Sequence, residues 1–237
     1  MNLNIHFIWI QSLKYNHKDP LIPKGIKDNY EKIIALNKNI KFNKNIWYDE
    51  NITYLIQKTF PQYLNIYKNI NDLRFKSDLS RLIILYVYGG IYIDIDQEVL
   101  KGFVSFDNII DKKLVLVFND RKDELSNGFI YVKEKRNKYI KLCLESYFEI
   151  IKKKEIGACK IMKELFDTMY KNIKIGKTED ITILQERPLK NLKDCHSKEE
   201  FWKSFYIFNS DNEPIMKSRY DNYYKDRRSI NNLVIFR

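Results

Sequence analysis

The chain has 237 residues, of which 44% are hydrophobic and 14% aromatic, a composition that can fill a core and excludes wholesale disorder. Its net charge is +11, but the basic residues are spread along the whole chain, which weakens the case for a nucleic-acid-binding surface. Only 7 glycines are present and only Gly89 and Gly90 are adjacent, which argues against the glycine-rich phosphate loops of ATPases and dehydrogenases.

The length fits one domain over residues 1–237. The cysteines Cys143, Cys159 and Cys195 are odd in number and widely spaced, which argues against a disulfide framework and a thiolate zinc site. The first residues lack a charged region before an apolar run, and no apolar stretch is long enough to span a bilayer. We therefore expect a soluble cytoplasmic protein without a signal peptide or transmembrane anchor.

The first third of the chain alternates between two apolar patterns. Alternating or continuous short apolar runs predict strands, and apolar residues three and four apart predict helices. The order is a strand over 5–10, a helix over 26–36, a strand over 40–48, a helix over 52–59 capped by residues 49–51, and a helical stretch over 63–70.

The clearest helix covers residues 74–88, where Leu79, Leu82, Ile83 and Leu85 form one apolar stripe. Gly89-Gly90 ends it, and the sequence then predicts a strand over 91–95. Alternation of strands with helices indicates an α/β fold with helices on both faces of a sheet. Short strands over 114–118 and 128–133, a helical segment around 138–170 and a C-terminal tail or lid around 196–237 complete the chain.

A group of polar residues surrounds the glycine pair. Asp78 and Arg81 are three apart and so share a helix face, whereas Tyr92, Asp94 and Asp96 would share one face of the following strand. We expect these side chains to converge at the carboxyl end of that strand, where open α/β sheets bind their ligands. Two carboxylates two residues apart suit an oxygen-preferring cation such as Mn²⁺ or Mg²⁺.

The segment SDLSRLIILYVYGGIYIDID, residues 77–96, resembles the core of the DXD-sugar-binding glycosyltransferases. This family includes α-mannosyltransferases, capsular-polysaccharide sugar transferases and the catalytic domains of large clostridial glucosylating toxins. Two upstream segments, IHFIWI at 5–10 and WYDEN at 47–51, are similar to the first and second strands of these enzymes. The resemblance implies a GT-A fold with a Rossmann-like mixed sheet, a nucleotide-sugar donor, Mn²⁺ or Mg²⁺, and retention at the anomeric carbon.

The resemblance also implies roles for individual residues. Trp9 would stack on the base beside the backbone of Ile8, and Asn51 would approach the nucleoside. Asp96 would be the direct metal ligand, with Asp94 near the ribose or sugar and also the ion. The remaining site residues are Asp78 and Arg81, which would hold sugar hydroxyls and phosphate, Tyr92, which would line the donor pocket, and Asn127, near donor and acceptor. Asp94, Asp96 and Arg81 are the expected catalytic residues.

The later sequence offers candidates for a third metal ligand and for a lid over the diphosphate, namely His196, Trp202 and the stretch 219–228. Trp9 can also be read as a core aromatic residue, and Asn51 as the N-cap of a helix. Asn127 precedes Gly128, and that pair is also an ordinary turn signal.

The donor, the acceptor and the reaction class are separate questions. The upstream segments favour a UDP-sugar, UDP-glucose-like, over GDP-mannose, and the acceptor hydroxyl belongs to a glycan, a protein or a lipid-linked sugar. One alternative is a metal-dependent phosphatase or phosphotransferase with Asp94 as nucleophile and Asp96 as acid, although Glu98 fills the usual Thr or Val position. The other is a non-catalytic, basic nucleic-acid-binding protein.

Overall fold

In the computed structural model, a mixed nine-stranded sheet organises the described residues, which are 2–10, 24–106, 109–119, 124–152, 181–189, 195 and 197–219. The strand order is β2-β1-β3-β6-β5-β7-β8-β9-β4. The strands are β1 (Asn2–Ile8), β2 (Lys41–Trp47), β3 (Gly90–Ile93), β4 (Glu98–Val99), β5 (Leu114–Asn119), β6 (Glu124–Val132), β7 (Ile181–Pro188), β8 (Phe205–Phe208) and β9 (Pro214–Lys217).

Both parallel and antiparallel pairs occur in this sheet. Strand β1 pairs in parallel with β2 and β3, and β5 pairs in parallel with β7. The other neighbours are antiparallel, including β3 with β6 and β9 with β4. Strands β1, β2, β3, β5 and β7 therefore all run in one direction, and their carboxyl ends meet at one edge.

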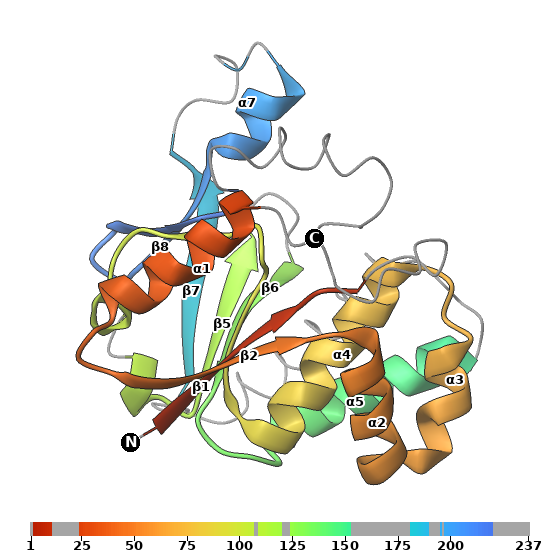
Figure 1. Ribbon diagram of the computed structural model, residues 1–237. Helices are drawn as coiled ribbons and strands as arrows, with labels where there is room; N and C mark the ends of the chain where they lie inside the picture. The colour runs from red at the N-terminus through yellow and green to blue at the C-terminus, as the bar shows by residue number, and fades with distance from the viewer. Residues whose placement is uncertain are drawn as a thin grey trace.

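Helices cover both faces of the sheet, as predicted (Figure 1). On one face, α4 packs beside α5, with α2 and α3 outside them, whereas α1 covers the other face. The helices are α1 (Lys24–Leu36), α2 (Asp49–Thr59), α3 (Leu64–Lys68), α4 (Leu73–Tyr88), α5 (Lys138–Lys152) and α7 (Lys198–Lys203), with short 3-10 turns at Pro61–Tyr63, Phe103–Ser105 and Ile109–Asp111.

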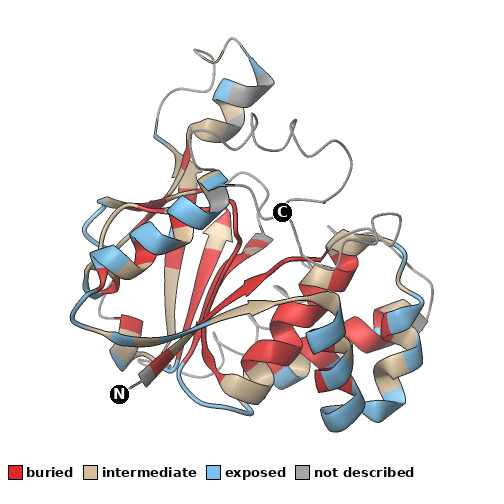
Figure 2. Ribbon diagram, viewed as in Figure 1, coloured by how far each residue is buried: buried red, intermediate tan, exposed pale blue. Residues whose placement is uncertain are grey.

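The sheet separates two apolar cores. The core under α4 contains Ile83 and Tyr147, and the opposite core contains Ile33 of α1 with Ile91 and Ile93 of β3. Figure 2 shows that α4 is buried along much of its length, whereas α1 exposes its outer side. The apolar stripe predicted for residues 74–88 is thus the contact surface of α4, and the isoleucines of β3 face the opposite core.

The reversal from α4 to β3 depends on the glycine pair. Gly89 and Gly90 have φ values of +63° and +94°, a region that favours glycine. A Cβ on Gly90 would lie 2.4 Å from the backbone oxygen of Asn4. His6 on β1 also holds the turn, since its Nε2 donates to the Gly89 oxygen at 2.8 Å while its Nδ1 accepts from Trp47 Nε1 at 3.1 Å. Strand β1 therefore fixes the turn that places α4 against β3.

Several predicted boundaries were wrong. Helix α2 begins at Asp49 rather than at Ile52, so Asn51 lies inside its first turn and is not the N-cap. Its Oδ1 accepts a hydrogen bond from the Tyr48 backbone N–H at 3.3 Å. Residues 49–51, which were predicted to cap the helix, therefore form its first turn.

The C-terminal region also differs from the expected tail or lid. Its residues 205–208 and 214–217 form β8 and β9 inside the sheet, because short apolar segments there pair with β7 and β4. Of the helical segment predicted around 138–170, α5 covers 138–152. The rest of that segment, His196, the Trp202 side chain and residues 220–237 lie outside the described part of the chain. Within that part, no helix is long and apolar enough to cross a membrane.

Candidate functional site

The two carboxylates of the Asp-x-Asp motif lie in a turn just beyond the end of β3. The predicted strand over 91–95 ends at Ile93, because pairing with β6 stops at Phe129. The Asp94 backbone N–H still donates to the Gly128 oxygen at 2.7 Å, and the Gln97 N–H then donates to the Asp94 oxygen at 3.0 Å. The prediction that strand alternation places Tyr92, Asp94 and Asp96 on one face was therefore wrong for Asp96.

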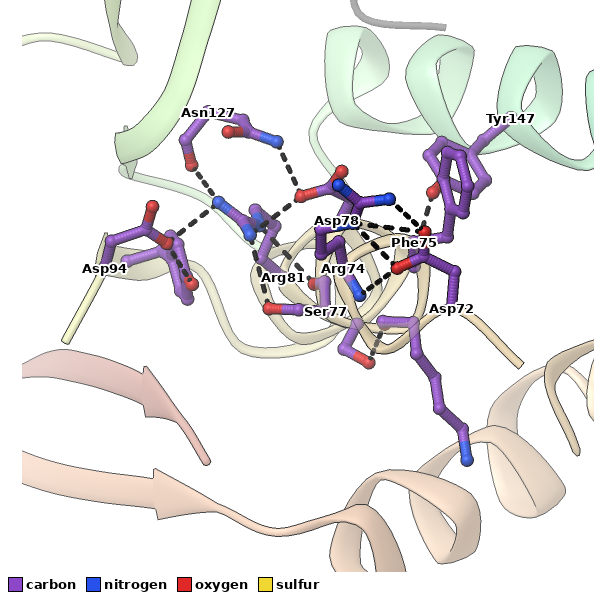
Figure 3. Close-up of polar contacts among 12 residues, drawn as sticks. Asp72, Arg74, Phe75, Ser77, Asp78, Arg81, Asp94, Asn127 and Tyr147 are labelled. Carbon is purple, nitrogen blue, oxygen red and sulfur yellow. Dashed lines mark hydrogen bonds and ion pairs between the residues drawn. The ribbon is translucent and has the colours of Figure 1, made fainter. Parts of the chain in front are cut away.

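Arg81 on α4 is the centre of a buried polar network (Figure 3). Its Nη1 lies 3.0 Å from Asp94 Oδ1, and its Nη2 lies 2.8 Å from Asp78 Oδ1. It also donates to the Asn127 backbone oxygen and to both the hydroxyl and the backbone oxygen of Ser77. Nε, Nη1 and Nη2 thus all contact protein acceptors, through four hydrogen bonds and the ion pair with Asp78, and the side chain is only 1% exposed.

The network joins three elements of the fold. The Tyr92 hydroxyl of β3 donates to Asp94 Oδ1 at 2.6 Å, and the Arg81 guanidinium lies over the Tyr92 ring. From β6, Asn127 Nδ2 donates to Asp78 Oδ1 at 2.7 Å. Of the five side chains predicted to converge, Asp78, Arg81, Tyr92 and Asp94 form this network, Asn127 joins it, and Asp96 makes none of these hydrogen bonds. Burial raises the pKa of the Tyr92 hydroxyl, which keeps it a hydrogen-bond donor to Asp94.

Asp96 has a different environment from Asp94. It is completely buried, yet neither of its carboxylate oxygens accepts a hydrogen bond. The Arg219 guanidinium lies nearby, with Nη1 3.2 Å from Asp96 Oδ1. Burial raises the pKa of Asp96 to about 7, against the opposing effect of Arg219. A buried carboxylate without hydrogen bonds is costly unless a cation neutralises it.

Three residues outside the predicted set hold this turn in place. Asn29 of α1 donates from Nδ2 to the backbone oxygens of Ile95, at 3.4 Å, and of Gln97. A Cβ on Gly128 would lie 2.5 Å from Gln97 Nε2 and 3.1 Å from Asp94 Oδ2, so the turn packs directly on the β6 backbone. The sequence gives no signal for Asn29, which is separated from the turn by 66 residues or more.

The residues expected to bind the nucleoside lie at the carboxyl end of β1 and in the first turn of α2. The Trp9 side chain is 2% exposed and packs in the core under α1, as its reading as a core aromatic residue requires. The Ile8 side chain packs in the opposite core. Asn51 is exposed in the first turn of α2. Contacts of these residues with a nucleotide stay predictions.

Asp94 and Asp96 are the residues of the turn that would hold a metal ion. Within the described residues, no cluster of three or more His, Cys, Asp or Glu side chains could hold a metal ion. The unbonded oxygens of buried Asp96 nevertheless fit a hard divalent cation, whose other positions would be filled by ligand or water oxygens. The third protein ligand sought at His196 falls on an undescribed residue.

A cavity of about 940 Å³ is lined by β7, by the β8–β9 turn and by Val104, Ser105 and Lys112. Its lining does not include Asp94 or Asp96. The turn, rather than this cavity, is the candidate site, because it holds Asp96, a buried carboxylate that lacks hydrogen bonds.

Comparisons with known proteins relate this chain to glycosyltransferases. Residues 16–116 match the family model described as "Glycosyltransferase sugar-binding region containing DXD motif", a span that includes α4, β3 and both carboxylates of the turn. An uncharacterized glycosyltransferase, L373, of Acanthamoeba polyphaga mimivirus is 30% identical over 102 residues, which are 43% of this chain and 38% of that protein. The chain thus covers well under half the length of this curated relative.

Among solved structures, the PaToxG glycosyltransferase superposes with a TM-score of 0.56 at 22% sequence identity. The match covers 73% of this chain and 70% of that one. The expected fold, a GT-A type with a Rossmann-like mixed sheet flanked by helices, is confirmed.

Proposed function

We propose that this chain, whose residues 16–116 match the model of the DXD-containing glycosyltransferases, transfers a sugar from a nucleoside-diphosphate sugar to an acceptor hydroxyl. The observation that carries the proposal is Asp96, a fully buried carboxylate without hydrogen bonds in a turn at the carboxyl edge of the sheet. The sequence segment, its place in the fold and the chemistry of the buried turn at the carboxyl edge of the sheet support the same reaction class.

Asp96 and Asp94 would hold Mn²⁺ or Mg²⁺, with Asp96 as the direct ligand. When bound, such an ion supplies a Lewis acid that neutralises the charge developing on the departing diphosphate. Asp94 would contact the ion or the sugar through Oδ2, because its Oδ1 is already held by Arg81 and Tyr92. These two contacts also disfavour the phosphatase alternative, since they lower the nucleophilicity of that oxygen.

The structure supports a positioning role for Arg81 rather than the direct donor contact that the resemblance implies. Its nitrogens contact protein acceptors in four hydrogen bonds and one ion pair, so contact with phosphate or sugar oxygens would require some of these to break. Its charge compensates the buried carboxylates of Asp78 and Asp94 and fixes their orientation. Preorganised carboxylates spare the reaction the reorganisation that water would require.

The donor we favour is a UDP-sugar, UDP-glucose-like, over GDP-mannose, with retention at the anomeric carbon. Trp9, Ile8 and Asn51 would bind the nucleoside, which requires the Trp9 ring to gain exposure on binding. The acceptor would be a hydroxyl of a glycan, a protein or a lipid-linked sugar.

The test is release of nucleotide from a panel of UDP- and GDP-sugars, with Mn²⁺, with Mg²⁺ and with EDTA. We expect one donor to be hydrolysed in the presence of the ion and to raise the melting temperature of the protein. No turnover and no thermal stabilisation with any donor would contradict the proposal, and full turnover in EDTA would remove the metal from it.

A further inference from the structure

Arg219 meets Asp96 because of the register of two short strands. In the antiparallel pair of β4 and β9, Glu98 lies opposite Lys217 and Val99 opposite Met216. Continuing this register by two residues brings Arg219 opposite Asp96. The observed Nη1 to Oδ1 distance of 3.2 Å agrees with that geometry. The ion pair therefore follows from the sheet and not from a chance surface contact.

The backbone before Arg219 is firmly anchored. Ser218 is buried, its N–H donates to the Phe205 oxygen at 3.0 Å, and its hydroxyl donates to Glu186 of β7. Glu186 is itself buried and accepts from Asn119 Nδ2 at 2.7 Å. The starting point of the Arg219 side chain is thus fixed beside the turn, and its Nη1, which faces Asp96, also donates to the Ser218 backbone oxygen at 2.6 Å.

The two partners of the ion pair differ in their exposure to solvent. Asp96 has no exposure and no hydrogen bond, so it depends on a nearby cation for compensation. The Arg219 side chain is 22% exposed and can move its charge toward solvent or a bound anion. A divalent ion on Asp96 would repel the guanidinium at this distance, so ion and guanidinium compete for the carboxylate.

We propose that Arg219 is the countercharge of Asp96 in the donor-free protein, and that it gives up this position to the divalent ion and turns to the diphosphate of the donor. The inference rests on the metal site of the proposed function. An arginine suits both states, because its planar, weakly hydrated guanidinium binds carboxylate and phosphate oxygens alike.

Removing this side chain has two opposite effects. The divalent ion no longer competes with a guanidinium whose partly exposed pair is worth about 1 kcal/mol, so Mn²⁺ alone binds about fivefold more tightly. With Mn²⁺ saturating, UDP loses a charge-assisted contact to its diphosphate, so its affinity falls about tenfold.

The experiment compares wild type, Arg219→Gln and Lys217→Gln. Lys217 precedes Arg219 by two residues on β9, so its substitution removes the same charge nearby without removing the contact with Asp96. Mn²⁺ affinity is measured at pH 8 by titration of the free ion, and UDP affinity by calorimetry in saturating Mn²⁺. Urea unfolding of each variant checks that it is folded.

We expect Arg219→Gln to bind Mn²⁺ more tightly and UDP more weakly than Lys217→Gln. Equality of the two variants in either measurement would overturn the exchange. If wild type binds Mn²⁺ and only the effect of Arg219 is missing, the metal site of the proposed function survives. If neither wild type nor Arg219→Gln binds Mn²⁺, both the exchange and that metal site are refuted.

Discussion

Replacing Arg81 with Met removes the cation that holds the polar network together. The side chain is 1% exposed and contacts Asp78 and Asp94, whose side chains are 3% and 7% exposed. Breaking a buried ion pair on one side leaves uncompensated charge and costs about 3–5 kcal/mol. We expect Arg81→Met to lower the free energy of unfolding by this amount, and Arg81→Lys, which keeps the charge but fewer donors, by less.

Equilibrium unfolding in urea measures this loss. The matched control is Arg74→Met, also on α4, because the Arg74 side chain is 42% exposed and its ion pair with Asp72 is partly solvated. That substitution should cost under about 1 kcal/mol. Adding Asp78→Asn to Arg81→Met should recover about 1–3 kcal/mol relative to the sum of the single changes. Equal losses for the two arginine variants would refute the role given to Arg81.

Three further predictions concern stability. Burial lowers the pKa of His6 to about 4, so the neutral ring favours the fold above pH 6.5 and this contribution is lost as the pH falls through 4. Between pH 7 and 4, wild type should lose about 3 kcal/mol more than His6→Gln in urea unfolding, and parallel curves would contradict this. Gly90→Ala should cost about 2–3 kcal/mol, because of the positive φ and the contact with Asn4, and an unchanged urea midpoint would exclude that strain. Asp96→Asn should gain about 1–2 kcal/mol in EDTA at pH 8, because Arg219 offsets only part of the cost of burying a carboxylate without hydrogen bonds, whereas a lower midpoint would show that Arg219 offsets all of it.

The local patterns of the chain were sufficient for α4, the glycine turn and the first strand after it. Apolar spacing identified the buried stripe of α4, and the adjacent glycines marked a reversal that the positive φ values confirm. The end of β3 was misplaced because the strand stops where β6 stops pairing with it, a fact of the partner strand. Alternation along one segment cannot reveal it.

Contacts between distant segments could not be read from the sequence. Asn29 reaches the turn from α1, and Arg219 reaches it through the register of β9 on β4. Strands β7, β8 and β9 were not predicted, since β7 is mixed in polarity, β8 and β9 have only four residues each, and all three are stabilised by their neighbours in the sheet. The saturation of Arg81 by protein acceptors is likewise a result of packing, because the motif alone presents it as a free cation.

The most direct test of the account compares Mn²⁺-dependent release of nucleotide from the preferred donor by wild type, Asp96→Asn and Asp211→Asn. Asp211 is an exposed carboxylate in the β8–β9 turn, so its variant controls for loss of one negative charge. We predict a loss of about 100-fold or more in Asp96→Asn and wild-type rates in Asp211→Asn. Wild-type turnover by a folded Asp96→Asn variant would contradict the central claim that this buried carboxylate holds the catalytic ion.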